Sequence, residues 1–116
     1  MRISAGLVLP LLGAALTLAQ PAFAQGGSAF DVCVGLRTVP DQRVQACTTV
    51  IEGEAEAGRH LAAAYCNRGY GLTEQRNFER ALADLDEALR LDPRYACALT
   101  NRGRVHALKG DPDRAI

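Results

Sequence analysis

The side chains with the clearest chemistry in this 116-residue sequence are its four cysteines, Cys33, Cys47, Cys66 and Cys97. An even number of cysteines favours disulfides in an oxidising compartment, and four cysteines allow three different pairings. Zinc binding is the competing use. However, the sequence contains no Cys-x-x-Cys, and neither His60 nor His106 falls at ligand spacing from a cysteine. We therefore expect disulfides, with no metal and no cofactor.

Catalytic motifs are not found at the spacing that their chemistry needs. The sequence has no Gly-x-Ser-x-Gly, no phosphate loop and no His-Glu-x-x-His. Lys109 stands beside Gly110 but lacks the spacing of a phosphate loop, and we interpret His106 as a packed histidine and not as a base. The 13 basic and 13 acidic residues cancel, which gives no indication of a nucleic-acid partner. We expect a protein that is not an enzyme.

Residues 1–24 have the pattern of a cleaved secretory signal. Arg2 precedes an uncharged apolar run from Ala5 to Ala19, and Ala22-Phe23-Ala24 places small residues before a cleavage point at Gln25. A retained membrane anchor is the alternative, but the run has 15 residues, short of the roughly 20 that a spanning helix needs. We expect a periplasmic or secreted protein without a membrane span after cleavage.

Helical periodicity begins after an expected flexible leader at residues 25–29. Phe30 to Leu36 predicts a short helix, and Asp41 is placed to cap a second one. One apolar face of this second helix recurs at helical spacing before the helix ends near Gly53, and it consists of Val44, Cys47, Thr48 and Ile51. These two helices form an expected hairpin within residues 30–61.

A stronger pair of helices follows a polar joint at Glu54 to Arg59. The first should run from Leu61 to about Gln75, and the second should start at an Asn77 cap and stop before Asp92-Pro93. The charged side of this second helix is interpreted as a solvated surface and not as catalytic carboxylates; it carries Glu79, Arg80, Asp84, Asp86, Glu87 and Arg90. Strand signals are absent from the sequence, so the expected fold class is all-α.

An internal repeat in the sequence supports the prediction of these helices. When residues 62–82 are aligned with residues 96–116, seven of the 21 positions are identical, including Asn67-Arg68-Gly69 against Asn101-Arg102-Gly103. A helical hairpin of 34 residues is the period of the tetratricopeptide repeat, and the sequence resembles that family. The resemblance implies stacked hairpins in a short right-handed solenoid, with one repeat at residues 62–95 and a partial one at residues 96–116.

The resemblance assigns structural positions within the repeat. They are Tyr65, Gly69, Leu72, Ala81, Leu85, Ala88 and Pro93, with Gly103 in the next repeat. Arg68 departs from the family pattern by replacing an apolar residue, and we expect its stem to cover apolar surface while its guanidinium reaches solvent. The first hairpin looks like a degenerate repeat, in which Cys33 and Cys47 would face one another, and Cys66 and Cys97 form a possible second bond.

Members of this family bind proteins or peptides on a concave face. The matching positions imply ligand contacts at Asn67, Tyr70, Glu74, Thr100, Asn101 and Arg104. The clamp that grips chaperone C-terminal carboxylates is not matched, because Tyr70 and Arg104 stand where it has asparagine. We expect a non-catalytic interaction module in the periplasm or cell envelope, with self-association possible through the unpaired last helix. The alternatives are a truncated fragment of a longer protein and a small secreted enzyme.

Overall fold

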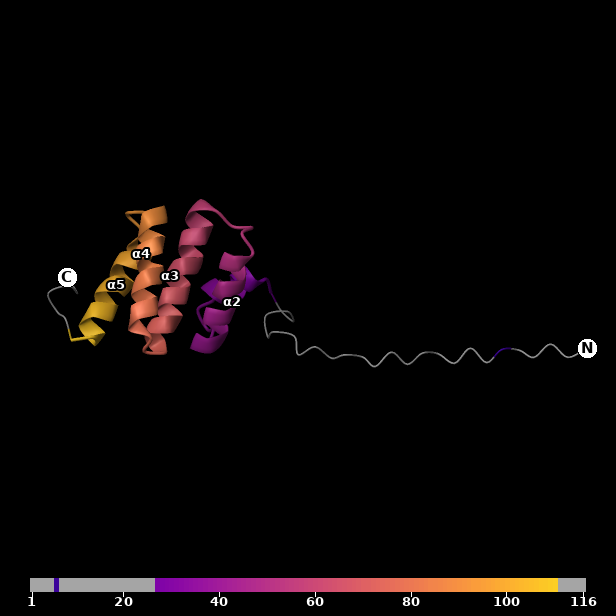
Figure 1. Ribbon diagram of the computed structural model, residues 1–116, viewed down its shortest axis with the longest axis horizontal. Helices are drawn as coiled ribbons and strands as arrows, with labels where there is room; N and C mark the ends of the chain where they lie inside the picture. The colour runs from indigo at the N-terminus through magenta and orange to yellow at the C-terminus, as the bar shows by residue number, and fades with distance from the viewer. Residues whose placement is uncertain (1–5, 7–26, 111–116) are drawn as a thin grey trace, which may run out of the picture.

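The computed structural model describes Gly6 and residues 27–110. Apart from Gly6, the expected signal at residues 1–24 lies outside the described residues, as does the chain from residue 111. Five helices follow in order, namely α1 (Ala29–Val34), α2 (Pro40–Glu52), α3 (Gly58–Glu74), α4 (Phe78–Leu91) and α5 (Ala96–Leu108). Each helix packs on the next, and α3 contacts all four others (Figure 1). The all-α prediction is confirmed, and stacked helical hairpins account for the described residues.

Helix α1 begins one residue earlier than expected. Ser28 and Ala29, placed in the flexible leader by the sequence, are the N-cap and the first residue of the helix. The Asp31 backbone N–H donates to Ser28 Oγ at 3.1 Å, and the Ser28 backbone N–H donates to Asp31 Oδ2 at 3.0 Å. This reciprocal capping box satisfies two donors that a helix start leaves open. It also lowers the pKa of Asp31, because the bonds with Ser28 favour the carboxylate.

The expectation that Asp41 caps α2 is wrong. Val39 is the N-cap residue and Pro40 occupies the first helical position, where its fixed φ suits the helix and its missing N–H costs nothing. Asp41 is consequently already inside the first turn. Its Oδ1 instead accepts a hydrogen bond from Gln75 Nε2 at 2.7 Å, which ties the start of α2 to the end of α3.

Helix α3 begins at Gly58, three residues before the expected start at Leu61, and the polar joint is correspondingly shorter. At its other end the chain turns sharply into α4. The Asn77 N–H donates to Leu72 O at 2.8 Å and the Arg76 N–H donates to Thr73 O at 3.0 Å, which is the Schellman pattern. Asn77 is the N-cap residue of α4, but its side chain makes no capping bond, contrary to expectation.

The turn between α3 and α4 contains a residue with a strained backbone conformation, Arg76. Arg76 has a φ of 61°, whereas Gly110 occupies the same repeat position with a φ of 80°. A left-handed conformation costs a non-glycine residue roughly 1–2 kcal/mol. We expect Arg76→Gly to raise the free energy of unfolding by about 1 kcal/mol despite losing the Arg76 contact over the Phe78 ring. Urea unfolding of this variant beside Arg80→Gly, an exposed site inside α4, checks the sign.

Two clusters of buried side chains form the core, on opposite sides of α3. The larger one joins α3, α4 and α5 and contains Cys66, Leu72, Ala81, Leu85, Ala88, Ala98 and Val105. The smaller one joins α1, α2 and α3 and contains Cys33, Ala46, Cys47, Val50 and Ala64. The buried face of α2 lies one position away from the expected one, since Val44, Thr48 and Ile51 are half-buried. No helix within residues 27–110 has the length and apolarity that crossing a bilayer requires.

Small residues let α3 and α4 approach closely. Ala81 and Ala88 are fully buried, and a Cβ added at Gly69 would lie 2.9 Å from Leu85 Cγ. We therefore expect Ala81→Leu to overpack this contact and to lower the free energy of unfolding by roughly 1–3 kcal/mol. Ala83→Leu places the same side chain on the exposed side of α4 and serves as the control. Equal melting temperatures for the two variants would contradict this account of the contact.

Candidate functional site

A cavity of about 210 Å³ opens on the molecule where α1, α3 and α5 meet. Its lining comes from the end of α1, the following loop and three further helices, and consists of Val34, Leu36, Arg43, Asn67, Tyr70 and Asn101. Three of these residues, Asn67, Tyr70 and Asn101, are among the ligand contacts implied by the sequence resemblance. We call this feature the Tyr70 cavity.

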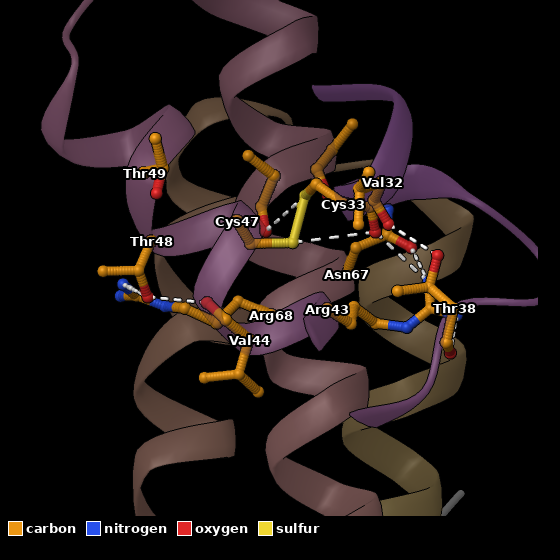
Figure 2. Close-up of a disulfide and its surroundings, with 12 residues drawn as sticks. Val32, Cys33, Thr38, Arg43, Val44, Cys47, Thr48, Thr49, Asn67 and Arg68 are labelled. Atoms are coloured by element: carbon orange, nitrogen blue, oxygen red, sulfur yellow. Dashed lines mark hydrogen bonds between the residues drawn. A yellow bond between two sulfur atoms is a disulfide. The ribbon is translucent and has the colours of Figure 1, made fainter. Parts of the chain in front are cut away.

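Three cavity residues were missed by the sequence analysis, namely Val34, Leu36 and Arg43, and Arg43 is the charged one. Its side chain is 5% exposed, and its guanidinium spans the loop after α1 (Figure 2). Nη2 donates to Gly35 O at 2.8 Å and to Thr38 O at 3.2 Å, while Nη1 donates to Cys33 O at 3.2 Å and to Asn67 Oδ1 at 3.3 Å. These acceptors are neutral, and Arg43 forms no salt bridge with a carboxylate of residues 27–110.

Two guanidinium groups lie close to the Tyr70 ring. The Cζ atoms of Arg43 and Arg104 are each 5.2 Å from the centroid of its ring, within the range of a cation–π contact. Arg43 approaches from α2 and Arg104 from α5. The exposed Arg104 has no salt bridge among the described residues, so its hydrogen-bond donors are free for a ligand.

The two asparagines of the Tyr70 cavity are partly occupied within the chain. Asn67 Nδ2 donates to Ala63 O at 2.9 Å, and Asn67 Oδ1 accepts from Arg43. Asn101 Nδ2 donates to Cys97 O at 3.0 Å and lies 3.6 Å from both sulfurs of the Cys66–Cys97 disulfide. Of these four amide atoms, Asn101 Oδ1 is the one without a partner in the described part of the chain, and it can accept a hydrogen bond from a ligand.

The other three implied contacts do not line the cavity, and Arg104 is placed beside it by its contact with the Tyr70 ring. Glu74 is exposed at the end of α3, and Thr100 is exposed on α5. Neither side chain lines the Tyr70 cavity. The repeat positions of Glu74 and Thr100 imply that both lie on the same side as Tyr70. Repeat positions do not give the extent of the cavity.

Both cysteine pairs named in the sequence analysis are bonded in the structure. Cys33–Cys47 joins α1 to α2 with a Cα–Cα distance of 4.7 Å, and Figure 2 shows the bond in yellow. Cys66–Cys97 joins α3 to α5 with a Cα–Cα distance of 6.5 Å. The four sulfurs are therefore used as crosslinks, and the second crosslink fixes the two helices that carry Tyr70 and Arg104.

Arg68 and Asp84 correct two further expectations, because neither side chain extends into solvent. Arg68 Nε donates to Asp84 Oδ2 at 2.7 Å and Nη2 donates to Asp84 Oδ1 at 2.8 Å, with side chains 16% and 9% exposed. Arg68 Nη1 also donates to Thr48 Oγ1 of α2 at 3.3 Å. This bidentate pair raises the pKa of Arg68, chiefly through the Asp84 hydrogen bonds. Its contacts join α2, α3 and α4.

A comparison with known protein families covers most of α3, all of α4 and the turn after α4. Residues 62–95 match the family model of the tetratricopeptide repeat. This segment is a tetratricopeptide repeat. Searches of curated proteins and of solved structures found no match to the chain.

Within the tetratricopeptide repeat, the residues that the resemblance called structural take part in packing to different degrees. Leu72, Ala81, Leu85 and Ala88 are buried, and Tyr65 is half-buried with Arg68 Cζ 5.6 Å from its ring centroid. Pro93 is exposed in the turn after α4, and Gly103 is half-buried on α5. Arg102, which corresponds to Arg68, makes only an exposed contact of 3.4 Å to Asp86.

Proposed function

We propose that this chain is a non-catalytic interaction module that binds a peptide or protein segment in the Tyr70 cavity, in the periplasm or outside the cell. The tetratricopeptide repeat itself points to a protein-binding scaffold. The observation that carries the proposal is the cavity, because it gathers three of the six implied contacts at one place. Its volume of about 210 Å³ is below the 300–1,000 Å³ of typical small-molecule sites and suits a side chain.

Apolar surface beside the cavity supports a peptide ligand. Leu36 is 98% exposed and Val39 is 53% exposed, both in the loop between α1 and α2. Exposed apolar groups that border a polar cavity are typical of protein-interaction surfaces. The extracytoplasmic location is supported by the two disulfides, since such bonds persist in oxidising compartments. The proposed signal at residues 1–24 would direct the chain there.

Site-specific crosslinking tests this function. We expect p-benzoylphenylalanine in place of Leu36 to give a discrete covalent adduct with a protein or peptide upon irradiation of the source cells. The same photoreactive residue in place of Arg80, exposed on α4, is the control. Tyr70→Ala should weaken the adduct at position 36. Equal labelling at both positions, or none at position 36, would overturn the proposed binding face.

The location has its own test. The mature protein should appear in the osmotic-shock or culture fraction with Gln25 as its first residue and with both disulfides formed. A chain that stays in the cytoplasmic fraction with its initiating methionine would contradict the proposed location. Because the fold depends on the two disulfides, crosslinking at position 36 of the purified oxidised chain in cell extract then tests the binding face separately from the location.

Self-association through α5 is a second candidate. A hollow of about 410 Å³ lies between α4 and α5, lined by Leu82, Asp86, Arg102 and His106. Leu99 and Leu108 of α5 are 45% and 42% exposed, so a second chain could bury them. Sedimentation velocity of the chain beside Leu108→Glu should then show a dimer that the substitution dissociates. A monomer over the whole concentration range excludes this candidate.

A further inference from the structure

We propose that the Tyr70 cavity selects a carboxylate of its peptide ligand, next to an apolar side chain. This inference rests on the proposed function and adds the chemical class of the ligand. The carboxylate would bind Arg104, in the field of Arg43, against the Tyr70 ring. The apolar neighbour would contact Val34 and Leu36, which border the same cavity.

The cavity is lined by one charged side chain, and it is positive. Arg43 is almost fully buried, and the partners of its guanidinium are three backbone carbonyls and the amide oxygen of Asn67. Neutral acceptors stabilise a buried cation but do not cancel its charge, so its field extends into the adjoining space. Arg43 lies outside residues 62–95, so this positive charge is not part of the repeat pattern.

The cavity residues of this structure, within 27–110, include no aspartate or glutamate. Glu74, one turn after Tyr70 on α3, is exposed and does not line the cavity. Asp41, two residues before Arg43, accepts a hydrogen bond from Gln75. Among residues 27–110, the cavity lining therefore places no carboxylate beside the Arg43 and Arg104 guanidiniums, each of which lies 5.2 Å from the Tyr70 ring centroid.

Arg104 and Asn101 offer hydrogen-bonding atoms that a ligand can use. Arg104 presents a planar guanidinium, which binds carboxylates through two parallel bonds. The Cys66–Cys97 disulfide holds α5 against α3, so Arg104 keeps its place over the Tyr70 ring. Asn101 Oδ1 adds an acceptor for a ligand backbone N–H. An acidic residue in an extended peptide offers both groups, a carboxylate and a neighbouring N–H.

Peptide arrays test the charge selection directly. Octapeptides that contain Leu-Glu, Leu-Asp, Leu-Gln, Leu-Asn or Leu-Lys, each in amidated and free-acid forms, are probed with the oxidised full chain. We expect binding by the acidic peptides, with a loss of about tenfold or more when the carboxylate becomes an amide. Binding should also weaken as salt rises. Binding by the amidated acidic peptides identifies a side-chain carboxylate, and binding restricted to free-acid forms identifies a C-terminal one.

A charge-matched pair of variants completes the test. Arg104→Gln should lose about tenfold or more in affinity for the acidic peptides, whereas Arg80→Gln on α4 removes the same charge far from the cavity and should not. Both sites are exposed, and circular dichroism confirms that both variants fold. If amide-containing and acidic peptides bind equally, or if Arg104→Gln equals Arg80→Gln, the carboxylate selection is wrong and the binding function stands. If no peptide binds, both proposals fail.

Discussion

Removing both disulfides should leave the chain largely unfolded. Cys33–Cys47 has a sequence separation of 14, and closing such a loop stabilises by about 3 kcal/mol on the chain-entropy argument. Cys66–Cys97 has a separation of 31, for which the same relation gives about 3.7 kcal/mol. The two loops do not overlap, so the effects should add. Their sum of roughly 6–7 kcal/mol is as large as the whole stability of many domains.

The structure explains why the chain should not stay folded without the two disulfides. Helix α1 has six residues, too few for a helix that is stable by itself, and Cys33 lies at the centre of the smaller core cluster. Thermal melts followed by circular dichroism, with and without reductant, measure the combined effect. Paired Cys→Ala variants separate the two bonds, and the Cys66–Cys97 pair should cost more. A reduced chain that melts like the oxidised one would contradict the prediction, as would a peptide map with four alkylatable thiols.

Arg68→Met should lower the free energy of unfolding by about 3 kcal/mol or more, because it leaves the Asp84 carboxylate buried without its cation. The pair is bidentate and its side chains are 16% and 9% exposed, so water cannot replace the lost guanidinium. For a domain of this size, the melting temperature should fall by at least about 12 °C. Loss of the Thr48 contact adds to the effect.

Double replacement distinguishes a buried charge from a simple loss of packing. Arg68→Met together with Asp84→Leu removes both charges, and we expect this variant to recover most of the stability that Arg68→Met loses. Arg90→Met breaks the exposed Glu87–Arg90 pair and should have little effect, since solvent screens such pairs. If Arg68→Met and Arg90→Met melt alike, the Arg68–Asp84 pair contributes no more than a surface contact.

Local patterns were enough to predict the helices and the repeat, because both depend on short-range spacing. Apolar and small residues recur with helical period through Leu85 and Ala88, and Asp92-Pro93 cannot continue a helix. The identities between residues 62–82 and 96–116 identified a 34-residue unit, and the family comparison confirms it at residues 62–95. Helix starts were less accurate: Val39 and not Asp41 is the N-cap of α2, and α3 begins at Gly58 and not at Leu61. Asn77 is the N-cap of α4 as predicted, although its side chain makes no capping bond.

The candidate site was predicted only in part. Repeat positions placed Asn67, Tyr70 and Asn101 on one side, and the structure brings all three to one cavity. Arg43 was missed because its acceptors are backbone carbonyls in the loop after α1, which no side-chain pattern reveals. One signal was available: Arg43, Ala46, Cys47 and Val50 fall on one helical face, which predicts burial of the arginine.

The sequence by itself determined the helical class, the repeat at residues 62–95 and the small residues that let α3 and α4 pack closely. These features depend on neighbours a few positions apart, or on one period of the repeat. Only the tertiary structure decided which charges are buried. Arg68 and Arg102 occupy the same repeat position, but Arg68 meets Asp84 between packed helices and Arg102 meets Asp86 in solvent. A charge becomes structural or available to a ligand through what packs against it, and that depends on segments far away in the chain.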